Sequence, residues 1–215
     1  MRKRFDLLIF DLDGVLVDTS SAHARAFSDL WRRIGIAGPD YDAIAGRKTI
    51  DVVHEFTADL KPSAAQIQDW VHFKQIQARA YLADHSILYG DTIPSLQALS
   101  QNHYPMALGT AASKETVRWI LKNVGLESFF SVIVTGDDLQ FGKPSPEIYL
   151  KVMSLADTDP DRTLIIEDSL SGIQSAVAAQ AYVAAIRTGV KIEGDRFIGA
   201  FFTLQDLIHE VGLNR

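Results

Sequence analysis

The chain has 215 residues, of which 47% are hydrophobic and 22% are charged, and its formal net charge is −6. These values are ordinary for a soluble globular protein, and the length allows one large domain or one domain with a smaller insert. Basic residues form a run only at positions 2–4, so nucleic acid is not an expected partner. Because the chain contains no cysteine, disulfides, thiolate metal sites and a cysteine nucleophile are excluded.

A membrane partner is not expected either. Every apolar run is shorter than the roughly 18 residues that a membrane-spanning helix needs. The first residues lead with charge into a short apolar run and lack the long apolar segment of a signal peptide. We therefore expect a cytoplasmic protein, and separately we expect a monomer.

The first part of the chain contains one predicted strand followed by helices. Residues 5–10 form a short, continuous apolar run, which is typical of a buried strand. Helical spacing of apolar residues then predicts three helices, at residues 20–34, 49–60 and 63–82. Gly35 is a stop signal after the first helix, and Ser63 is a suitable N-cap for the third. Helices therefore dominate residues 18–85.

Strands and helices alternate in the second part of the chain. Strands are predicted at residues 104–110, 130–136, 162–168 and 181–186. Helices are predicted between them, at residues 113–125, 145–156 and 169–180. This alternation is typical of a parallel sheet with helices on both faces.

The fold class that we predict is therefore α/β, with a Rossmann-like parallel sheet as its core. Strands resume only after a long helical gap, so we expect an inserted helical cap domain at residues 18–85. Residues 1–17 and 86–215 would then form the core domain. The alternative is a single continuous domain.

Polar side chains follow the predicted strands. In open α/β sheets the carboxyl ends of the strands meet at one edge, where ligands bind. The groups expected to converge there are Asp11 and Asp13, Thr110, Gly136, Asp137 and Asp138, Glu167 and Asp168, and Lys143 from a loop. Carboxylate oxygens are the ligands that Mg²⁺ prefers, and a hydroxyl and an ammonium can hold a phosphate. A divalent cation would also offset the repulsion among the aspartates.

Each of these features also has a structural interpretation. Asp-x-Asp-Gly is a common turn, Thr110 could cap a helix, Lys143 could be an exposed charge, and Asp168 or Ser169 could be an N-cap. Because the features occur together and in order, each at a strand end or in the loop ahead of a helix, the sequence favours a functional site.

Four segments resemble the ordered motifs of the haloacid dehalogenase-like superfamily: FDLDGVLVDT, LGTAAS, GKPSPEIY and IIEDSLSGIQSA. The similarity spans nearly the whole chain and is to the members with a helical cap, which include beta-phosphoglucomutases and phosphatases of phosphoglycolate and sugars. The resemblance implies that Asp11 is the nucleophile and Asp13 the general acid and base, and that Thr110 and Lys143 hold the phosphate. It also implies Mg²⁺ as the cofactor, with Asp11, Asp13, Glu167 and Asp168 around the metal.

The function that we predict is Mg²⁺-dependent hydrolysis of a small phosphomonoester, a sugar phosphate, through an aspartyl phosphate. The alternative is a phosphomutase similar to beta-phosphoglucomutase. Dehalogenation is a weaker interpretation, since release of halide needs no proton donor such as Asp13. A phosphoacceptor domain would need no helical insert, and a calcium loop of the EF-hand type would place its glycine at the sixth position rather than at Gly14, the fourth.

Substrate specificity is expected to come from the cap. His23 follows Asp18 by five residues, as a histidine does in relatives similar to beta-phosphoglucomutase. Thr49 stands where mutases carry an arginine, which favours hydrolysis. The predicted substrate-binding residues are His23, Gly46, Arg47, Lys74, Ala111 and Ser113, with Lys48 as a further basic candidate.

Overall fold

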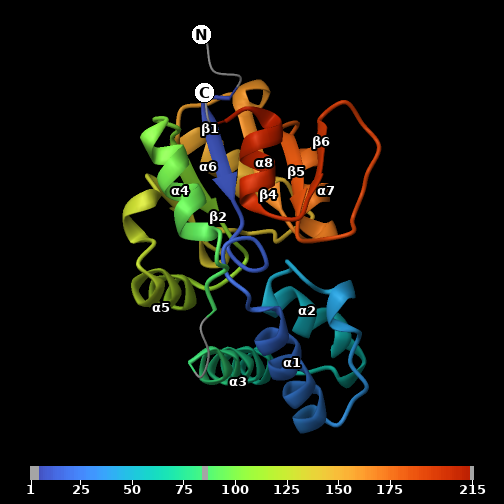
Figure 1. Ribbon diagram of the computed structural model, residues 1–215. Coiled ribbons are helices and arrows are strands. Elements are labelled where there is room, and N and C mark those ends of the chain that lie inside the picture. Colours follow the sequence, from blue (N-terminus) through green and yellow to red (C-terminus); the bar gives the residue numbers. More distant parts are fainter. Residues whose placement is uncertain (1–4, 84–86, 214–215) are drawn as a thin grey trace.

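The computed structural model describes residues 5–83 and 87–213. The basic run at residues 2–4 and the expected domain boundary at residues 85 and 86 lie outside the described residues. Six parallel strands form one sheet in the order β3-β2-β1-β4-β5-β6 (Figure 1). The strands are β1 (Leu7–Phe10), β2 (Met106–Gly109), β3 (Val132–Val134), β4 (Thr163–Glu167), β5 (Tyr182–Ile186) and β6 (Phe197–Phe201).

Helices occupy most of the rest of the described chain. They are α1 (Ser20–Ile34), α2 (Thr49–Phe56), α3 (Ala64–Leu82), α4 (Thr92–Gln101), α5 (Lys114–Val124), α6 (Glu147–Leu155), α7 (Leu170–Ala178) and α8 (Leu204–Val211). No helix of the described part is both long enough and apolar enough to cross a membrane.

The sheet is buried on both faces, which explains why its central strands read as continuous apolar runs. Successive side chains of a strand point to opposite faces. Leu8 and Phe10 of β1 belong to a buried cluster with α4, α5 and α8, whereas Leu7 and Ile9 belong to a second cluster with α6 and α7. The predicted α/β fold, a parallel sheet covered on both faces, is therefore confirmed.

Helices α1, α2 and α3 form a separate group with a hydrophobic cluster of its own. Its buried members are Phe27, Leu30, Trp31, Ile44, Val52, Val53, Ile67 and Val71. Figure 1 shows this group beyond one edge of the sheet, below the tip of β1. The chain enters and leaves it side by side, because Val17 forms a β-bridge with Leu88 and the Asp18 amide donates to the Ile87 carbonyl at 2.6 Å.

Local sequence signals account for most element boundaries. Helix α1 has the predicted bounds, and Gly35 ends it in the left-handed conformation, with φ of 83°. Ser63 caps α3 in a capping box with Gln66. The helix predicted at residues 49–60 ends earlier, at Phe56, and a 3-10 turn, Ala58–Leu60, follows it.

Three elements were not predicted from the sequence: α4, β6 and α8. Strand β6 lies at the edge of the sheet and is only partly buried, but its sequence FIGAF is a continuous apolar run that could have revealed it. Helix α8 has a capping box of Thr203 and Asp206, a signal that could have revealed it.

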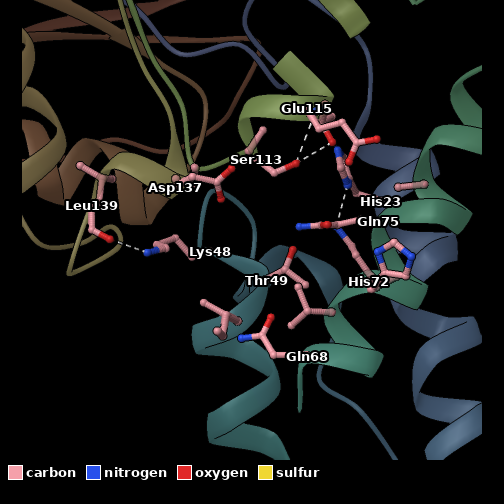
Figure 2. Close-up of a pocket in the computed structure, with 18 residues that line it drawn as sticks. His23, Lys48, Thr49, Gln68, His72, Gln75, Ser113, Glu115, Asp137 and Leu139 are labelled. Carbon is pink, nitrogen blue, oxygen red and sulfur yellow. Dashed lines mark hydrogen bonds between the residues drawn. The ribbon is translucent and has the colours of Figure 1, made fainter. Parts of the chain in front are cut away.

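A cavity of about 410 Å³, called the chamber below, lies between the helical group and the loops after β2 and β3 (Figure 2). Its lining includes His72 and Lys74 of α3 and Ser113 and Asp137 of the loops. A smaller cavity of about 50 Å³, called the recess, adjoins it and reaches Asp11, Asp13 and Thr110. Both cavities share His23, Thr49, Lys74, Ala111 and Ala112 as lining residues.

Candidate active site

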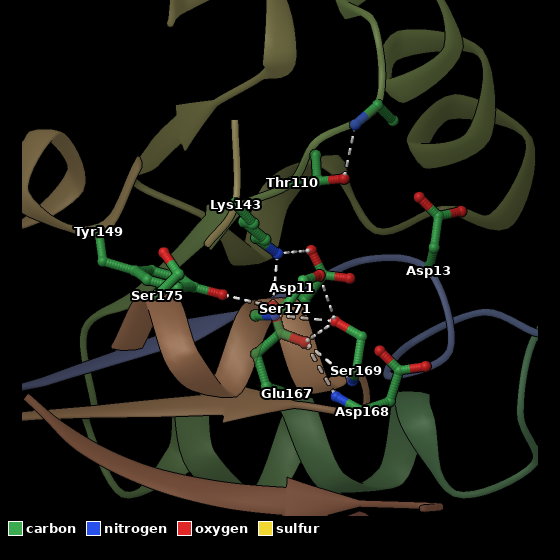
Figure 3. A network of polar contacts seen from close by, with 12 residues as sticks. Asp11, Asp13, Thr110, Lys143, Tyr149, Glu167, Asp168, Ser169, Ser171 and Ser175 are labelled. Atoms are coloured by element: carbon green, nitrogen blue, oxygen red, sulfur yellow. Dashed lines mark hydrogen bonds and ion pairs between the residues drawn. The ribbon is translucent and has the colours of Figure 1, made fainter. Parts of the chain in front are cut away.

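The floor of the recess is a buried ionic network. Asp11 follows β1, Glu167 ends β4, and Lys143 comes from the loop before α6. The Lys143 ammonium donates to Asp11 Oδ1 at 2.7 Å and to Glu167 Oε1 at 2.5 Å (Figure 3). The three residues are at most 3% exposed. One positive charge therefore joins the ends of two strands that are neighbours in the sheet.

Glu167 accepts hydrogen bonds on both carboxylate oxygens. Besides Lys143, Oε1 accepts from the buried Tyr149 hydroxyl at 2.6 Å. Oε2 accepts from the Asp168 and Ser169 amides at 3.0 and 3.2 Å and from Ser169 Oγ at 3.1 Å. Five donors meet a group with about four lone-pair sites, so this carboxylate is held rigidly and has little capacity for another ligand.

The carboxylates at this edge carry more negative charge than Lys143 neutralises. Ligand oxygens of Asp11, Glu167 and Asp168 lie within 4.8 Å of one another. Burial raises the pKa of Asp11 to about 8, and repulsion from Glu167 and Asp13 adds to this against the opposing effect of Lys143. Burial and the charges of Glu167 and Asp11 likewise raise the pKa of Asp168 well above its usual range. This donor set fits a divalent cation, with Asp11 and Asp168 as the carboxylates that retain free lone pairs.

Gly14 allows Asp168 to approach the loop after β1. Its φ of +77° lies in the left-handed region, and a Cβ atom on it would lie 1.9 Å from Asp168 Oδ2. A side chain at this position would therefore displace a candidate metal ligand. Gly14, the glycine of the Asp-x-Asp-Gly pattern, therefore leaves room for the Asp168 carboxylate.

Asp13 is positioned by groups from the first helix. The Thr19 hydroxyl donates to Asp13 Oδ1 at 2.5 Å, and His23 Nε2 lies 3.4 Å from the same oxygen. Burial tends to raise the pKa of Asp13, but the hydrogen bond and charge of His23, the Thr19 hydroxyl and Lys74 together lower it. Asp13 is therefore ionised in the structure and its carboxylate is oriented.

Lys74 and His23 form a pair at the junction of the recess and the chamber. Lys74 Nζ lies 2.8 Å from His23 Nδ1, so an ammonium there donates to Nδ1 and leaves the Nε2 proton to face Asp13. Lys74 is 4% exposed, and burial lowers its pKa to about 8, against the opposing attraction of Asp13. The Lys74 ammonium also lies 4.4 Å from the centre of the Phe27 ring.

The other predicted site residues lie around these groups with distinct roles. Thr110 is 1% exposed, lines the recess and accepts from the Ala112 amide at 3.1 Å. Ala111 lines both cavities. Ser113 lines the chamber, but its hydroxyl also accepts from the Thr116 amide at 3.4 Å as the N-cap of α5. Ser113 therefore has a structural role besides any contact with substrate.

The predicted substrate-binding residues of the helical group differ in whether their side chains already have partners in the protein. Gly46 lines the recess with φ of +74°, and a Cβ on it would lie 2.3 Å from Ser169 Oγ, so glycine permits close contact with the sheet edge. Arg47 also lines the recess, but its guanidinium pairs with Glu55 at 2.5 Å. Lys48 lines the chamber and donates to the Leu139 carbonyl at 2.9 Å.

Two strand-end carboxylates do not join the Asp11 cluster. Asp137 accepts from the Lys114 amide at 2.8 Å, near the start of α5, and lines the chamber instead. Asp138 accepts from the amide and the hydroxyl of Thr135 at 2.9 and 2.7 Å, in a capping box. The expectation that all strand-end groups converge is therefore wrong for this pair, since their oxygens satisfy local backbone donors.

Several residues of the site were not identified from the sequence. They are Thr19, Tyr41 and Phe27 at the recess, Tyr149 beneath Glu167, and Gln68, His72 and Gln75 at the chamber. Thr19 lies in the first motif segment and could have been noticed there. The others sit on helices or turns whose orientation depends on tertiary packing.

A sheet with this strand order and an acidic site at its carboxyl edge defines a ligand-binding α/β protein. The chain belongs to the haloacid dehalogenase-like hydrolase family, whose model matches residues 8–186. It is 31% identical over 179 residues to hexitol phosphatase A of Escherichia coli (strain K12), covering 83% of this chain and 81% of that protein.

Two further comparisons agree with this assignment. Fructose-1-phosphate phosphatase YqaB of Escherichia coli (strain K12) is 29% identical over 191 residues, covering 83% of this chain and 95% of that protein. The crystal structure of a haloacid dehalogenase hydrolase, family IA, variant 3, from Entamoeba histolytica has the same fold, with a TM-score of 0.82 and 22% identity over 98% of this chain and 99% of that one.

Proposed function

We propose that the protein is a Mg²⁺-dependent phosphatase that hydrolyses a small phosphomonoester, a sugar phosphate, through an aspartyl phosphate on Asp11. The observation that carries this proposal is the pair of adjoining cavities. The recess of about 50 Å³ lies at Asp11 and Thr110, where the phosphate would bind, and the chamber beside it provides about 410 Å³ for the leaving group. The names of the hexitol and fructose 1-phosphate phosphatases support the same class of substrate.

We also propose that α1, α2 and α3 form a cap domain, inserted at residues 18–85 into a core of residues 1–17 and 86–215. The separate hydrophobic cluster supports this division. The paired entry and exit at Val17 and Leu88 support it as well. A cap in this position covers the site and excludes water during phosphoryl transfer.

In the first step Asp11 attacks phosphorus and the ester oxygen leaves, giving an aspartyl phosphate. Lys143 and Thr110 hold the transferring group, and Lys143 keeps Asp11 oriented through its 2.7 Å hydrogen bond. Asp11 and Asp168, with the main-chain carbonyl of Asp13, would hold Mg²⁺, which supplies positive charge that offsets repulsion between carboxylate and phosphate. Glu167 supports this arrangement by anchoring Lys143.

Asp13 handles the protons of both steps. The general acid must be protonated when the ester oxygen leaves, and the same residue, once ionised, takes a proton from the attacking water. The Asp13 pKa is lowered in the structure by His23, Thr19 and Lys74. Binding of a dianionic phosphate would oppose that effect and favour the protonated form.

A phosphomutase would need a second phosphate site in the cap. Arg47 pairs with Glu55 and Lys48 binds the Leu139 carbonyl, so both cations at this position already have partners. Thr49, where mutases carry arginine, lines the cavities with a neutral side chain. We therefore propose hydrolysis. The contact of His23 with Asp13 fits a phosphomutase as well and does not separate the two functions.

The test is release of inorganic phosphate from p-nitrophenyl phosphate and a panel of sugar and polyol phosphates, with Mg²⁺ and with EDTA. The substitution Asp11→Asn should lower turnover by at least about 10³-fold, since an amide cannot attack phosphorus. The matched control is Asp6→Asn, because Asp6 precedes the same strand and pairs with Arg162.

Two results would contradict the proposal. Retention of more than a few per cent of activity in Asp11→Asn would remove Asp11 from the nucleophile role. Rapid conversion of β-glucose 1-phosphate to glucose 6-phosphate, with a trace of glucose 1,6-bisphosphate and negligible phosphate release, would favour the mutase.

A further inference from the structure

Helix α3 presents a row of polar side chains to the chamber. Gln68, His72 and Gln75 line it, and their spacing of four and three residues places them on one face of the helix. Figure 2 shows them across the chamber from Ser113 and Asp137. The row continues from Lys74 at the recess, so it lies where the leaving group of a phosphate ester would extend.

The fold does not depend on hydrogen bonds from these three side chains. Within residues 5–83 and 87–213, no hydrogen bond joins the Gln68, His72 or Gln75 side chain to another part of the chain. Each glutamine amide offers two donors and an acceptor, and the imidazole offers one of each. Hydroxyl groups can donate and accept in the same way, so a polyol chain or sugar ring matches this surface.

The charges of the chamber oppose a second anion. Lys48 is engaged by the Leu139 carbonyl, and Lys74 faces His23 at the recess. The carboxylates of Asp137 and Glu115 line the opposite side. Glu115 pairs with Arg79 at 3.2 Å, so Asp137 is the carboxylate that a second phosphate would meet. The Lys48 ammonium keeps its charge, but its hydrogen bond to the Leu139 carbonyl fixes its position.

We propose that the α3 face formed by Gln68, His72 and Gln75 selects the leaving group, and that the selected group is an uncharged polyhydroxylated chain or ring without a second phosphate. The proposal rests on the proposed function, because it requires the ester phosphate to occupy the recess. It adds the residues that recognise the leaving group and the class of compound that they reject.

The experiment compares kcat/KM of the wild-type protein and its variants for three substrates with Mg²⁺. They are a hexitol 6-phosphate, glucose 1,6-bisphosphate and p-nitrophenyl phosphate, whose aryl group has no hydroxyl to be recognised. Gln75→Ala and the double variant Gln68→Ala/Gln75→Ala remove the amides. Gln77→Ala is the matched control, since Gln77 lies on the same helix but not among the residues that line the chamber.

We expect Gln75→Ala to lower kcat/KM for the hexitol phosphate by about 10-fold, as for loss of one or two hydrogen bonds. The double variant should lower it further, and both should change p-nitrophenyl phosphate hydrolysis by less than about 2-fold. The wild-type protein should prefer the hexitol phosphate over the bisphosphate by at least about 10-fold. Alanine favours helix, so the variants should unfold at the wild-type temperature or above.

Equal losses for the hexitol and aryl phosphates, or an equal effect of Gln77→Ala, would overturn the proposal. So would a wild-type preference for the bisphosphate, or hydrolysis of the aryl ester without hydrolysis of any polyol or sugar phosphate. A wild-type protein that releases phosphate from none of the three substrates would instead overturn the proposed function itself, which separates the two failures.

Discussion

The two sides of the proposed active site are built in opposite ways. On the sheet side, the Lys143, Asp11 and Glu167 side chains are almost fully buried and bind one another. On the helical side, Gln68 and His72 are exposed and make no hydrogen bond with the described chain. Groups that act on phosphate need one rigid geometry, whereas groups that recognise a leaving group must be free to bind it. The residues proposed to act on the phosphate therefore lie on the sheet side, and the residues proposed to recognise the leaving group lie on the helical side.

The largest effect that would test this contrast is expected from Lys143→Met. The substitution leaves the buried Asp11 and Glu167 carboxylates without their cation, so we expect a loss of unfolding free energy of about 3–5 kcal/mol in the metal-free protein. Activity should fall by about 10³-fold, because stabilisation of the transferring phosphate is lost as well. Urea unfolding and phosphate release measure the two quantities.

Lys151→Met is the matched control for that variant. Lys151 lies on α6 and donates to the Asp138 carbonyl from an exposed position. Ordinary stability and kinetics of Lys143→Met would show that the buried network has no part in catalysis.

A smaller and more selective effect is expected from Asp13→Ala. General acid and base catalysis contributes about 10²–10⁴-fold, and the loss should be greatest for alkyl phosphates with poor leaving groups. For p-nitrophenyl phosphate the leaving group departs without a proton, so the loss in the first step should be much smaller. The ratio of kcat/KM for the two substrate types is the measurement, and an equal loss for both would exclude Asp13 as the general acid.

The smallest effect concerns Lys74, the one buried cation at the junction of the two sides within the described residues. We expect Lys74→Met to raise KM by about 10-fold through loss of a charged contact with the phosphate. It should also raise the unfolding free energy at pH 7 by about 1 kcal/mol, because a buried charge is replaced by an apolar chain of similar length.

The charge on Lys74 should make both kcat/KM and the free energy of unfolding depend on pH. The pKa of Lys74 is about 8 in the folded protein, below the ordinary value of 10.5 for a free lysine side chain, because the side chain is buried. The ratio of wild-type kcat/KM to that of Lys74→Met should therefore fall as pH rises through about 8, where the ammonium loses its proton. Between pH 8 and 10.5 the unfolded chain binds more protons, so wild-type stability should rise with pH relative to Lys74→Met. Parallel pH profiles of the two proteins would contradict this assignment.

The sequence predicted the sheet side of the site better than the helical side. Asp11, Glu167 and Thr110 follow buried strands, and the parallel order of those strands is enough to bring them together. Lys143 was also predicted, because it lies in the segment GKPSPEIY, which resembles a family motif. Tyr149 was missed because its apolar helical position gives no sign that its hydroxyl reaches Glu167.

The helical side depends on contacts between distant parts of the chain. Its orientation is set by hydrogen bonds such as Lys48 to the Leu139 carbonyl and Ser171 to the Ala45 carbonyl. Neither contact can be inferred from periodicity, so Gln68, His72 and Gln75 of α3 were not predicted as site residues. Lys74 of the same helix was predicted as a substrate-binding residue, and it is buried in the structure.

The bridge between Val17 and Leu88 has a consequence for how such a protein can change over time. Because the two ends of the proposed insert meet at this bridge, the intervening segment could be lengthened, shortened or exchanged without moving the ends that join it to the sheet. The ionic network on the sheet side lies entirely outside that segment, on residues 11, 143 and 167. New substrate preferences can therefore arise by replacement of one contiguous stretch of gene, while the reacting groups keep their positions.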